Sequence, residues 1–195
     1  YEEGSYFWLS YYDKGIDNVA WVLDFSKEKN YEHIYQYDGC IVTVDGSVVI
    51  EQMRFDAVAN VFEVSEDENE SLNAVSFSCL FKEDVEYTIQ IYTDLWDASN
   101  PYSGIKRASI SGATTHAGYY TIPLEETISL RKDTNYAVVI RFKEPGSVDT
   151  EYSLSHRESP IRSVASMDWG QSLYYKNGKW KDLWDSYKSV GIGNF

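Results

Sequence analysis

A strict alternation of apolar and polar residues in the middle of the chain constrains its fold more than any other feature. It spans residues 85–92. The apolar positions are Val85, Tyr87, Ile89 and Ile91. A period of two is typical of a β-strand that buries one face and leaves the other in water. We therefore predict a strand here rather than a helix.

The same pattern predicts two further strands downstream. Residues 136–142 are apolar enough for a central strand, and residues 118–124 contain Pro123, which indicates a strand end or an edge. The intervening residues 94–104 are rich in Asp, Asn, Ser, Pro and Gly, which favour a loop. Ser111 and Gly112 are predicted as turn residues as well.

Other segments complete an all-β pattern. Strands are predicted at residues 19–25, 57–64, 72–81 and 151–154. The dipeptides Asp45-Gly46 and Asn177-Gly178 predict tight hairpin turns, and the acidic residues 65–71 predict a solvated hairpin loop. No stretch has sustained helical periodicity. About a dozen short strands separated by turns predict an all-β sandwich of jelly-roll type.

Four of these segments carry a resemblance to a known family. Residues 87–93 (YTIQIYT), 100–104 (NPYSG), 117–122 (AGYYTI) and 136–140 (YAVVI) resemble, in that order, the lectin-like domain of bacterial surface papain-like cysteine proteases. Residues 30–39 resemble the opening segment of the same domain. The resemblance implies a lectin-like or carbohydrate-binding-module-like β-sandwich over residues 18–195. It identifies a fold better than a ligand.

The N-terminal residues resemble a different part of such proteases. Gly4 and the aromatic residues 6–11 are similar to the last strand of a papain-like catalytic domain. Residues 1–17 are therefore expected to be a remnant strand and linker of a preceding protease domain. The alternative is that they form an N-terminal strand of the sandwich itself. The catalytic cysteine, histidine and asparagine segments of that family are absent, so we predict that this chain is not an enzyme.

The charge and cysteine content exclude several classes of function. Lysine and arginine total 17 against 31 acidic residues, a net charge of -14, which opposes binding to phosphate backbones and anionic membranes. The histidines stand in separate segments, without the spacing of metal ligands or of a nucleophile and its base. Cys79 alternates with apolar residues and is predicted to be a buried free thiol, the alternative being a bridge to Cys40. No catalytic constellation is predicted.

A ligand-binding site is a better hypothesis for this chain than a catalytic site. Sugars are bound by aromatic faces beside carboxylate and amide groups, because C–H surfaces stack on rings while hydroxyls form hydrogen bonds. That mixture occurs in the 94–104 loop and near the C-terminus, although for each tryptophan taken singly a core position, or one that plugs the end of the sandwich, is favoured. The predicted ligand-binding residues are Asp94, Trp96, Asp97, Asn100, Tyr102, Trp180 and Trp184.

The resemblance also implies a cofactor and partners. Members of the family bind calcium, so a structural Ca²⁺ is expected. The carboxylates predicted to hold it are Asp38, Asp94, Asp97 and Glu151. The expected partners are the papain-like catalytic domain of the same protein and a glycan or cell-wall polymer, outside the cell or on its surface. The alternatives are a structural interface domain that packs on the protease without binding sugar, and an autonomous glycosidase.

Overall fold

The computed structural model divides the chain into two compact units, Tyr1–Ile34 and Tyr35–Phe195. The structure describes residues 31–37, 55–65, 70–79, 83–146, 154–155, 162–163 and 166–185, and for residues 144–146, 154–155 and 162–163 only the backbone. The predicted strand at residues 19–25, the Asp45-Gly46 hairpin and the remnant segment 1–17 lie outside the described residues. The fold described below is that of the second unit.

Ten strands account for most of the described residues of this unit. They are β1 (Phe55–Glu63), β2 (Glu70–Cys79), β3 (Glu86–Leu95), β4 (Ile105–Ala113), β5 (Gly118–Leu130), β6 (Asn135–Gly146), β7 (Leu154–Ser155), β8 (Arg162–Ser163), β9 (Ser172–Lys176) and β10 (Lys179–Asp182).

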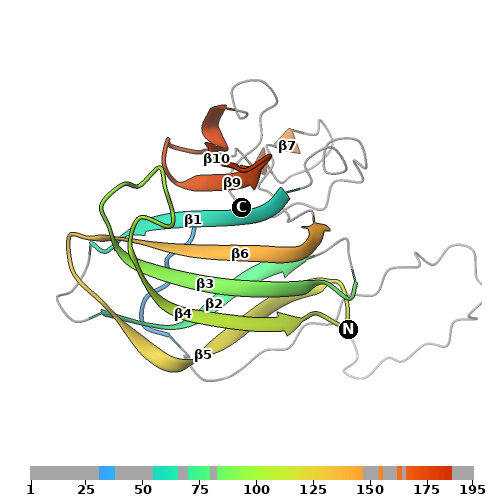
Figure 1. Ribbon diagram of the computed structural model, residues 1–195, viewed down its shortest axis with the longest axis horizontal. Coiled ribbons are helices and arrows are strands. Elements are labelled where there is room, and N and C mark those ends of the chain that lie inside the picture. Colours follow the sequence, from blue (N-terminus) through green and yellow to red (C-terminus); the bar gives the residue numbers. More distant parts are fainter. Residues whose placement is uncertain are drawn as a thin grey trace, which may run out of the picture. The chain divides into compact units, whose positions relative to one another are not determined.

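The longer strands form two facing sheets (Figure 1). One has six strands in the order β10-β9-β1-β6-β3-β4, and the other consists of β2 and β5. All the pairings are antiparallel. The chain passes from the large sheet to the small one at β2 and again at β5, returning each time. This confirms the predicted all-β sandwich.

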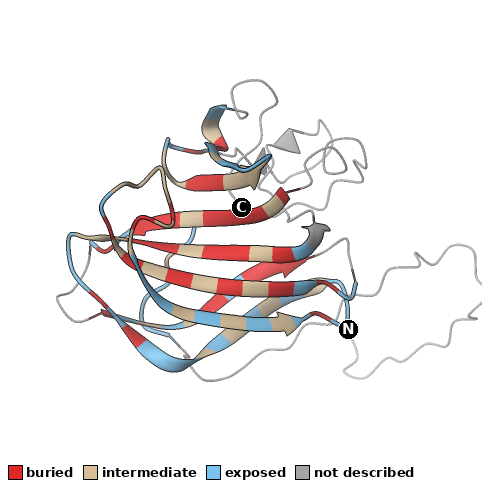
Figure 2. Cartoon of the chain, viewed as in Figure 1, coloured by how far each residue is buried: buried red, intermediate tan, exposed pale blue. Residues whose placement is uncertain are grey.

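The core lies between the two sheets. On β3, Tyr87, Ile89 and Ile91 face inward and are at most 7% exposed, while the residues between them are less buried (Figure 2). Val75 and Phe77 of β2 close the core from the small sheet. Fully burying one such aliphatic side chain stabilises the fold by roughly 1.5–3 kcal/mol. The period of two in the sequence thus has its cause in this two-layer packing.

The other face of the large sheet carries a second, smaller apolar cluster. Its buried members are Ala57, Ala59, Val61, Leu95, Ala137, Val139 and Leu173. Ala98 and Tyr102, from the loop after β3, pack against this cluster. The loop therefore folds back over the outer face of the sheet and does not extend from its end. Small alanines on β1 and β6 leave room for it.

Several predictions about individual segments can now be compared with the structure. The Asn177-Gly178 hairpin is confirmed: both residues have positive φ (55° and 78°), as a type I′ turn requires, and join β9 to β10. Pro123 lies inside β5, at a register shift in a two-stranded sheet, which fits its predicted edge position. Cys79 is buried, as predicted, and Cys40 lies outside the described residues.

Two predictions are wrong. Ser111 and Gly112 are not turn residues but lie within β4, where Gly112 pairs with Tyr87. The strands that flank the acidic segment 65–71 do not form a hairpin either, because β1 pairs with β6 and β9 whereas β2, which begins at Glu70, pairs with β5. This segment connects the two sheets instead. Charge and turn propensity indicate a solvated connection but cannot tell whether it joins neighbouring strands.

Candidate functional site

The loop of residues 96–104 is held in one conformation by its own polar side chains. Asp97 Oδ1 accepts hydrogen bonds from the backbone N (2.9 Å) and hydroxyl (2.7 Å) of Ser99. Asn100 Oδ1 accepts one from the Tyr102 N–H (3.1 Å), and the Ser103 hydroxyl donates to the Asp97 carbonyl (2.9 Å). Short polar side chains that bond nearby backbone groups build such turns. Asp97 and Asn100, predicted to bind ligand, therefore have a structural role here.

Tyr102 and Trp180, also predicted to bind ligand, meet in an aromatic cluster that we define as Tyr92, Tyr102, Tyr175 and Trp180. The Trp180 ring lies 5.3 Å from the rings of Tyr102 and of Tyr175, edge-on in both cases. Tyr102 also packs on Tyr92 at 5.1 Å. Such pairs contribute about 0.5–1.5 kcal/mol beyond their buried area. The cluster joins the loop to β9 and β10 across the sheet.

Arg141 of β6 lies within this aromatic cluster. Its Nη1 donates a hydrogen bond to the Tyr102 hydroxyl (2.9 Å), and its guanidinium lies 5.7 Å from the centre of the Tyr175 ring. Burial raises the pKa of Tyr92, so this phenol stays neutral under ordinary conditions. Within the described residues no acceptor reaches the buried Trp180 Nε1. The rings of Tyr102 and Trp180 thus pack between the loop and the sheet.

Trp96 is the predicted residue that the structure leaves open to solvent. Its side chain is 77% exposed, although the loop around it is ordered by hydrogen bonds. Trp184 follows β10, and its backbone N–H donates to Asp182 Oδ1 (2.9 Å). The structure thus separates the predicted set into one exposed aromatic and several supporting residues.

Asp94 contacts a different group of residues. Its Oδ1 lies 2.8 Å from an Arg131 nitrogen and its Oδ2 lies 3.4 Å from an Arg107 nitrogen, while the Thr93 hydroxyl donates to Oδ2 (3.0 Å). Its backbone is in the left-handed region, with a φ of 57°. Two guanidinium groups already neutralise this carboxylate. Asp94 therefore ties the end of β3 to β4 and to the turn after β5.

The four carboxylates predicted to bind calcium also lie in different surroundings. Asp38 and Glu151 lie outside the described residues, and the charge of Asp94 is compensated by arginines. Asp97 is different, because no cationic side chain among the described residues neutralises its charge. In the described part of the chain, no three His, Cys, Asp or Glu side chains come together as metal ligands would. The calcium site stays a prediction.

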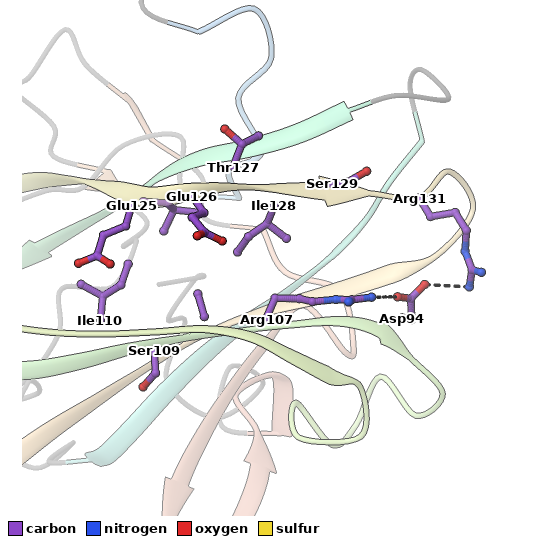
Figure 3. A pocket seen from close by; sticks show the side chains of 12 residues that line it. Asp94, Arg107, Ser109, Ile110, Glu125, Glu126, Thr127, Ile128, Ser129 and Arg131 are labelled. Carbon is purple, nitrogen blue, oxygen red and sulfur yellow. Dashed lines mark hydrogen bonds and ion pairs between the residues drawn. The ribbon is translucent and has the colours of Figure 1, made fainter.

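A groove that the sequence did not indicate lies between β4 and β5 (Figure 3). It has a volume of about 580 Å³, and the charged residues along it are Asp94, Arg107, Glu125, Glu126 and Arg131. One sequence signal could have drawn attention to it. From Tyr120 to Leu130 of β5, aromatic or aliphatic residues recur at every second position except at Glu126, which is exposed and stands between Leu124 and Ile128.

The fold defines a lectin-like β-sandwich, and the comparisons with known proteins identify the family. The chain belongs to the lectin-like domain family: the family model described as "Lectin like domain" matches residues 34–193. This confirms the resemblance found in the sequence. No curated protein matches the chain. Across the described residues, no helix has both the length and the apolar character needed to cross a membrane.

Two solved structures share the fold. One contains the cysteine protease and lectin-like domains of Cwp84, a surface layer associated protein of Clostridium difficile; it has a TM-score of 0.52 and 21% identity, covering 70% of this chain and 30% of that one. The other is the clostridial cysteine protease Cwp84 after propeptide cleavage, with a TM-score of 0.50 and 23% identity, covering 65% and 31%. The present chain thus spans about a third of either protein.

Proposed function

We propose that this chain is the non-catalytic lectin-like accessory domain of a papain-like cysteine protease at the cell surface, where it binds a glycan or cell-wall polymer. Family membership supports a lectin-like domain. The arrangement in Cwp84, whose structure holds a cysteine protease and a lectin-like domain, supports a protease as its partner. The surface-layer association of Cwp84 supports the cell surface as its location.

The observation that carries this proposal is the exposure of Trp96 on an ordered loop. An indole that is 77% exposed adds nothing to the stability of the fold, yet hydrogen bonds accepted by Asp97 and Asn100 hold the loop that carries it. A rigid loop loses little conformational entropy when a ligand binds, and an indole face suits the C–H surface of a sugar ring. Trp96 is therefore the residue that we assign to ligand contact.

The same exposed indole would also suit the alternative function. Tryptophan is enriched among the residues that dominate protein–protein interfaces, so Trp96 could instead anchor the domain to the catalytic domain without any sugar. An experiment on this proposal must therefore measure glycan binding and domain association separately.

The test compares Trp96→Ala with Tyr119→Ala, a matched control. Tyr119 is an aromatic residue of β5 that is 61% exposed on the other sheet. We expect Trp96→Ala to weaken sedimentation with purified cell-wall polysaccharide up to about tenfold, since one stacked ring contributes about 0.5–1.5 kcal/mol. Tyr119→Ala should bind as the unchanged chain does, and both variants should keep its melting temperature.

Other outcomes would change the assignment. Equal binding by Trp96→Ala and the unchanged chain would show that the loop is not the site. If the chain binds no polysaccharide, but associates with the catalytic domain in a manner that depends on Trp96, the interface function replaces the lectin function.

The non-catalytic part of the proposal rests on the chemistry of the described residues. Cys79 is 1% exposed and packs among the core residues, so a substrate cannot reach its sulfur. We expect no hydrolysis of casein, of small peptides or of any bound glycan. Peptidase activity that disappears in Cys40→Ser alone would contradict this.

A further inference from the structure

The groove between β4 and β5, which we call the edge groove, lies where the two sheets of the sandwich face each other at their margins. Among the described strands, β4 is the last of the large sheet and β5 belongs to the two-stranded sheet. Figure 3 shows Glu126 and Ile128 pointing from β5 toward Arg107 and Ile110 on β4. Its volume of about 580 Å³ falls within the range of small-molecule sites.

Both walls of the edge groove are interrupted by a β-bulge. On β4, Ile91 pairs with Ala108 and Tyr92 with Lys106, which leaves Arg107 as the extra residue. On β5, the pairs of Leu72 with Ile128 and of Ala74 with Pro123 leave residues 124–127 opposite Asn73. Bulges re-aim side chains and are over-represented beside functional sites. Because both strands that line the groove carry a bulge, the groove is a candidate functional site.

The bulge on β5 supplies hydrogen-bond acceptors. Glu125 and Glu126 line the groove next to Leu124, both are exposed, and Glu126 points toward β4 (Figure 3). No side chain of the described residues pairs with either carboxylate. Their oxygens are therefore available to accept hydrogen bonds from a ligand.

The other end of the groove supplies donors. Arg107 donates from Nε to the Thr93 hydroxyl (2.9 Å) and from Nη2 to Asp94 (3.4 Å), and its side chain stays 44% exposed. Arg131 reaches Asp94 with one nitrogen and is 73% exposed. A guanidinium has five N–H donors, so both arginines keep several for a ligand. Asp94 acts as a positioning residue that fixes the two guanidinium groups.

We propose that the edge groove binds a neutral saccharide, with its hydroxyls donating to Glu125 and Glu126 and accepting from Arg107 and Arg131. A hydroxyl both donates and accepts, so a sugar can form hydrogen bonds with the carboxylates and with the guanidinium groups at once. The side chains of Ile110 and Leu124 supply apolar surface for its C–H groups. A purely cationic or purely anionic ligand would meet its own sign at one end. This inference deepens the proposed lectin function and rests on it.

The test measures binding of neutral tetrasaccharides built of hexose or of N-acetylhexosamine units by titration calorimetry. We expect Glu126→Ala to weaken binding of the saccharide that the unchanged chain prefers by up to about tenfold, as for loss of one ordinary hydrogen bond. Glu126→Gln should lose much less, because an amide still bonds a hydroxyl. Glu86→Ala, which removes an exposed carboxylate that is bonded to Lys143 on the outer face of the large sheet, is the matched control and should leave binding unchanged.

Each result bears on the inference. If the unchanged chain binds a tetrasaccharide and Glu126→Ala binds it equally well, the edge-groove assignment is overturned while the lectin function stands. If Glu126→Gln loses as much as Glu126→Ala, the carboxylate charge is essential, and a neutral ligand is the wrong class. If the unchanged chain binds no glycan, the proposed function and the edge-groove site fall together.

Discussion

The ring of Tyr87 lies against Gly112, its partner across the β3–β4 ladder. A Cβ atom added at Gly112 would lie 2.6 Å from Tyr87 Oη and 2.8 Å from Cζ, closer than atoms can approach. The ring cannot easily move away, because it is 7% exposed and packs edge-on against Phe77 at 5.0 Å. The absence of a side chain at Gly112 is therefore a condition of the core packing.

We predict that Gly112→Ala destabilises the fold by about 1–3 kcal/mol, the usual cost of overpacking a core. Gly118→Ala is the control, since a Cβ there meets its nearest neighbour, on Tyr120, at an ordinary 3.6 Å. That variant should stay within about 0.5 kcal/mol of the unchanged chain. Urea denaturation measures both. Equal losses would show that glycine is needed in these strands for some reason other than the Tyr87 ring.

The ion pairs of Asp94 should contribute little to stability. The side chains of Arg107 and Arg131 are 44% and 73% exposed, and exposed pairs contribute at most about 1 kcal/mol. We expect Asp94→Asn to lower the free energy of unfolding by no more than that, and the difference to shrink in about 1 M salt.

A second substitution at this position tests the backbone. Asp94 has a φ of 57°, which asparagine tolerates but alanine does not. Asp94→Ala should therefore cost about 1–2 kcal/mol more than Asp94→Asn, and salt should not reduce this additional loss. If the two variants unfold at the same urea concentration, the left-handed backbone at residue 94 carries no cost.

The pH dependence of stability should reflect Tyr37. Its hydroxyl donates to the Val61 carbonyl (2.6 Å) and its ring stacks on Phe62 at 4.7 Å. Burial, with smaller contributions from Glu63 and Asp168, raises the pKa of Tyr37 from 10.0 to about 12. Because the folded-state pKa lies above the unfolded one, this contribution to stability is complete below about pH 10 and is lost as the pH rises toward 12.

Tyr37→Phe should therefore show a smaller loss of stability over this pH range than the unchanged chain. Tyr136 has a pKa raised by burial in the same direction, so part of the alkaline loss should persist. Near neutral pH the variant should lose about 1 kcal/mol with its hydrogen bond to Val61. Tyr119→Phe serves as the exposed control. An unchanged alkaline slope in Tyr37→Phe would contradict the shifted pKa.

Removal of calcium tests the predicted metal site. If Asp38, Asp94, Asp97 and Glu151 hold a structural ion, a chelator should lower the melting temperature, because an ion that binds only the folded state stabilises it. The stabilisation is about 2.7 kcal/mol at a free calcium concentration 100 times the dissociation constant. Asp97→Asn keeps the acceptor for Ser99 but removes a charge, and should reduce the calcium-dependent shift. Identical melting curves with chelator and with calcium would show that the predicted structural calcium is wrong.

The candidate site was partly predictable. Trp96, Tyr102 and Trp180 are all predicted because sugar sites combine aromatic rings with carboxylates and amides, and the structure leaves Trp96 exposed. Tyr102 and Trp180 meet the same criterion but are packed together, since residues 78 positions apart meet only when β10 and the loop reach the same sheet. Asp97 and Asn100 form the loop's own turns, which their residue types also favour.

What the sequence by itself determined is the alternating strands such as β3 and β6 and the Asn177-Gly178 turn, and with them the all-β class. Alternation along β3 and the Asn177-Gly178 turn are local properties, since they depend on which face of one strand is buried and on the φ angles that two residues tolerate. The tertiary structure alone decided that residues 105–113 form an edge strand, that β1 and β2 lie in different sheets, and that Arg107 and Glu126 line one groove. The first two features depend on which strands pair, and the third depends also on the register shifts between β3 and β4 and between β2 and β5. A bulge exists only relative to its partner strand, so no single segment can specify it.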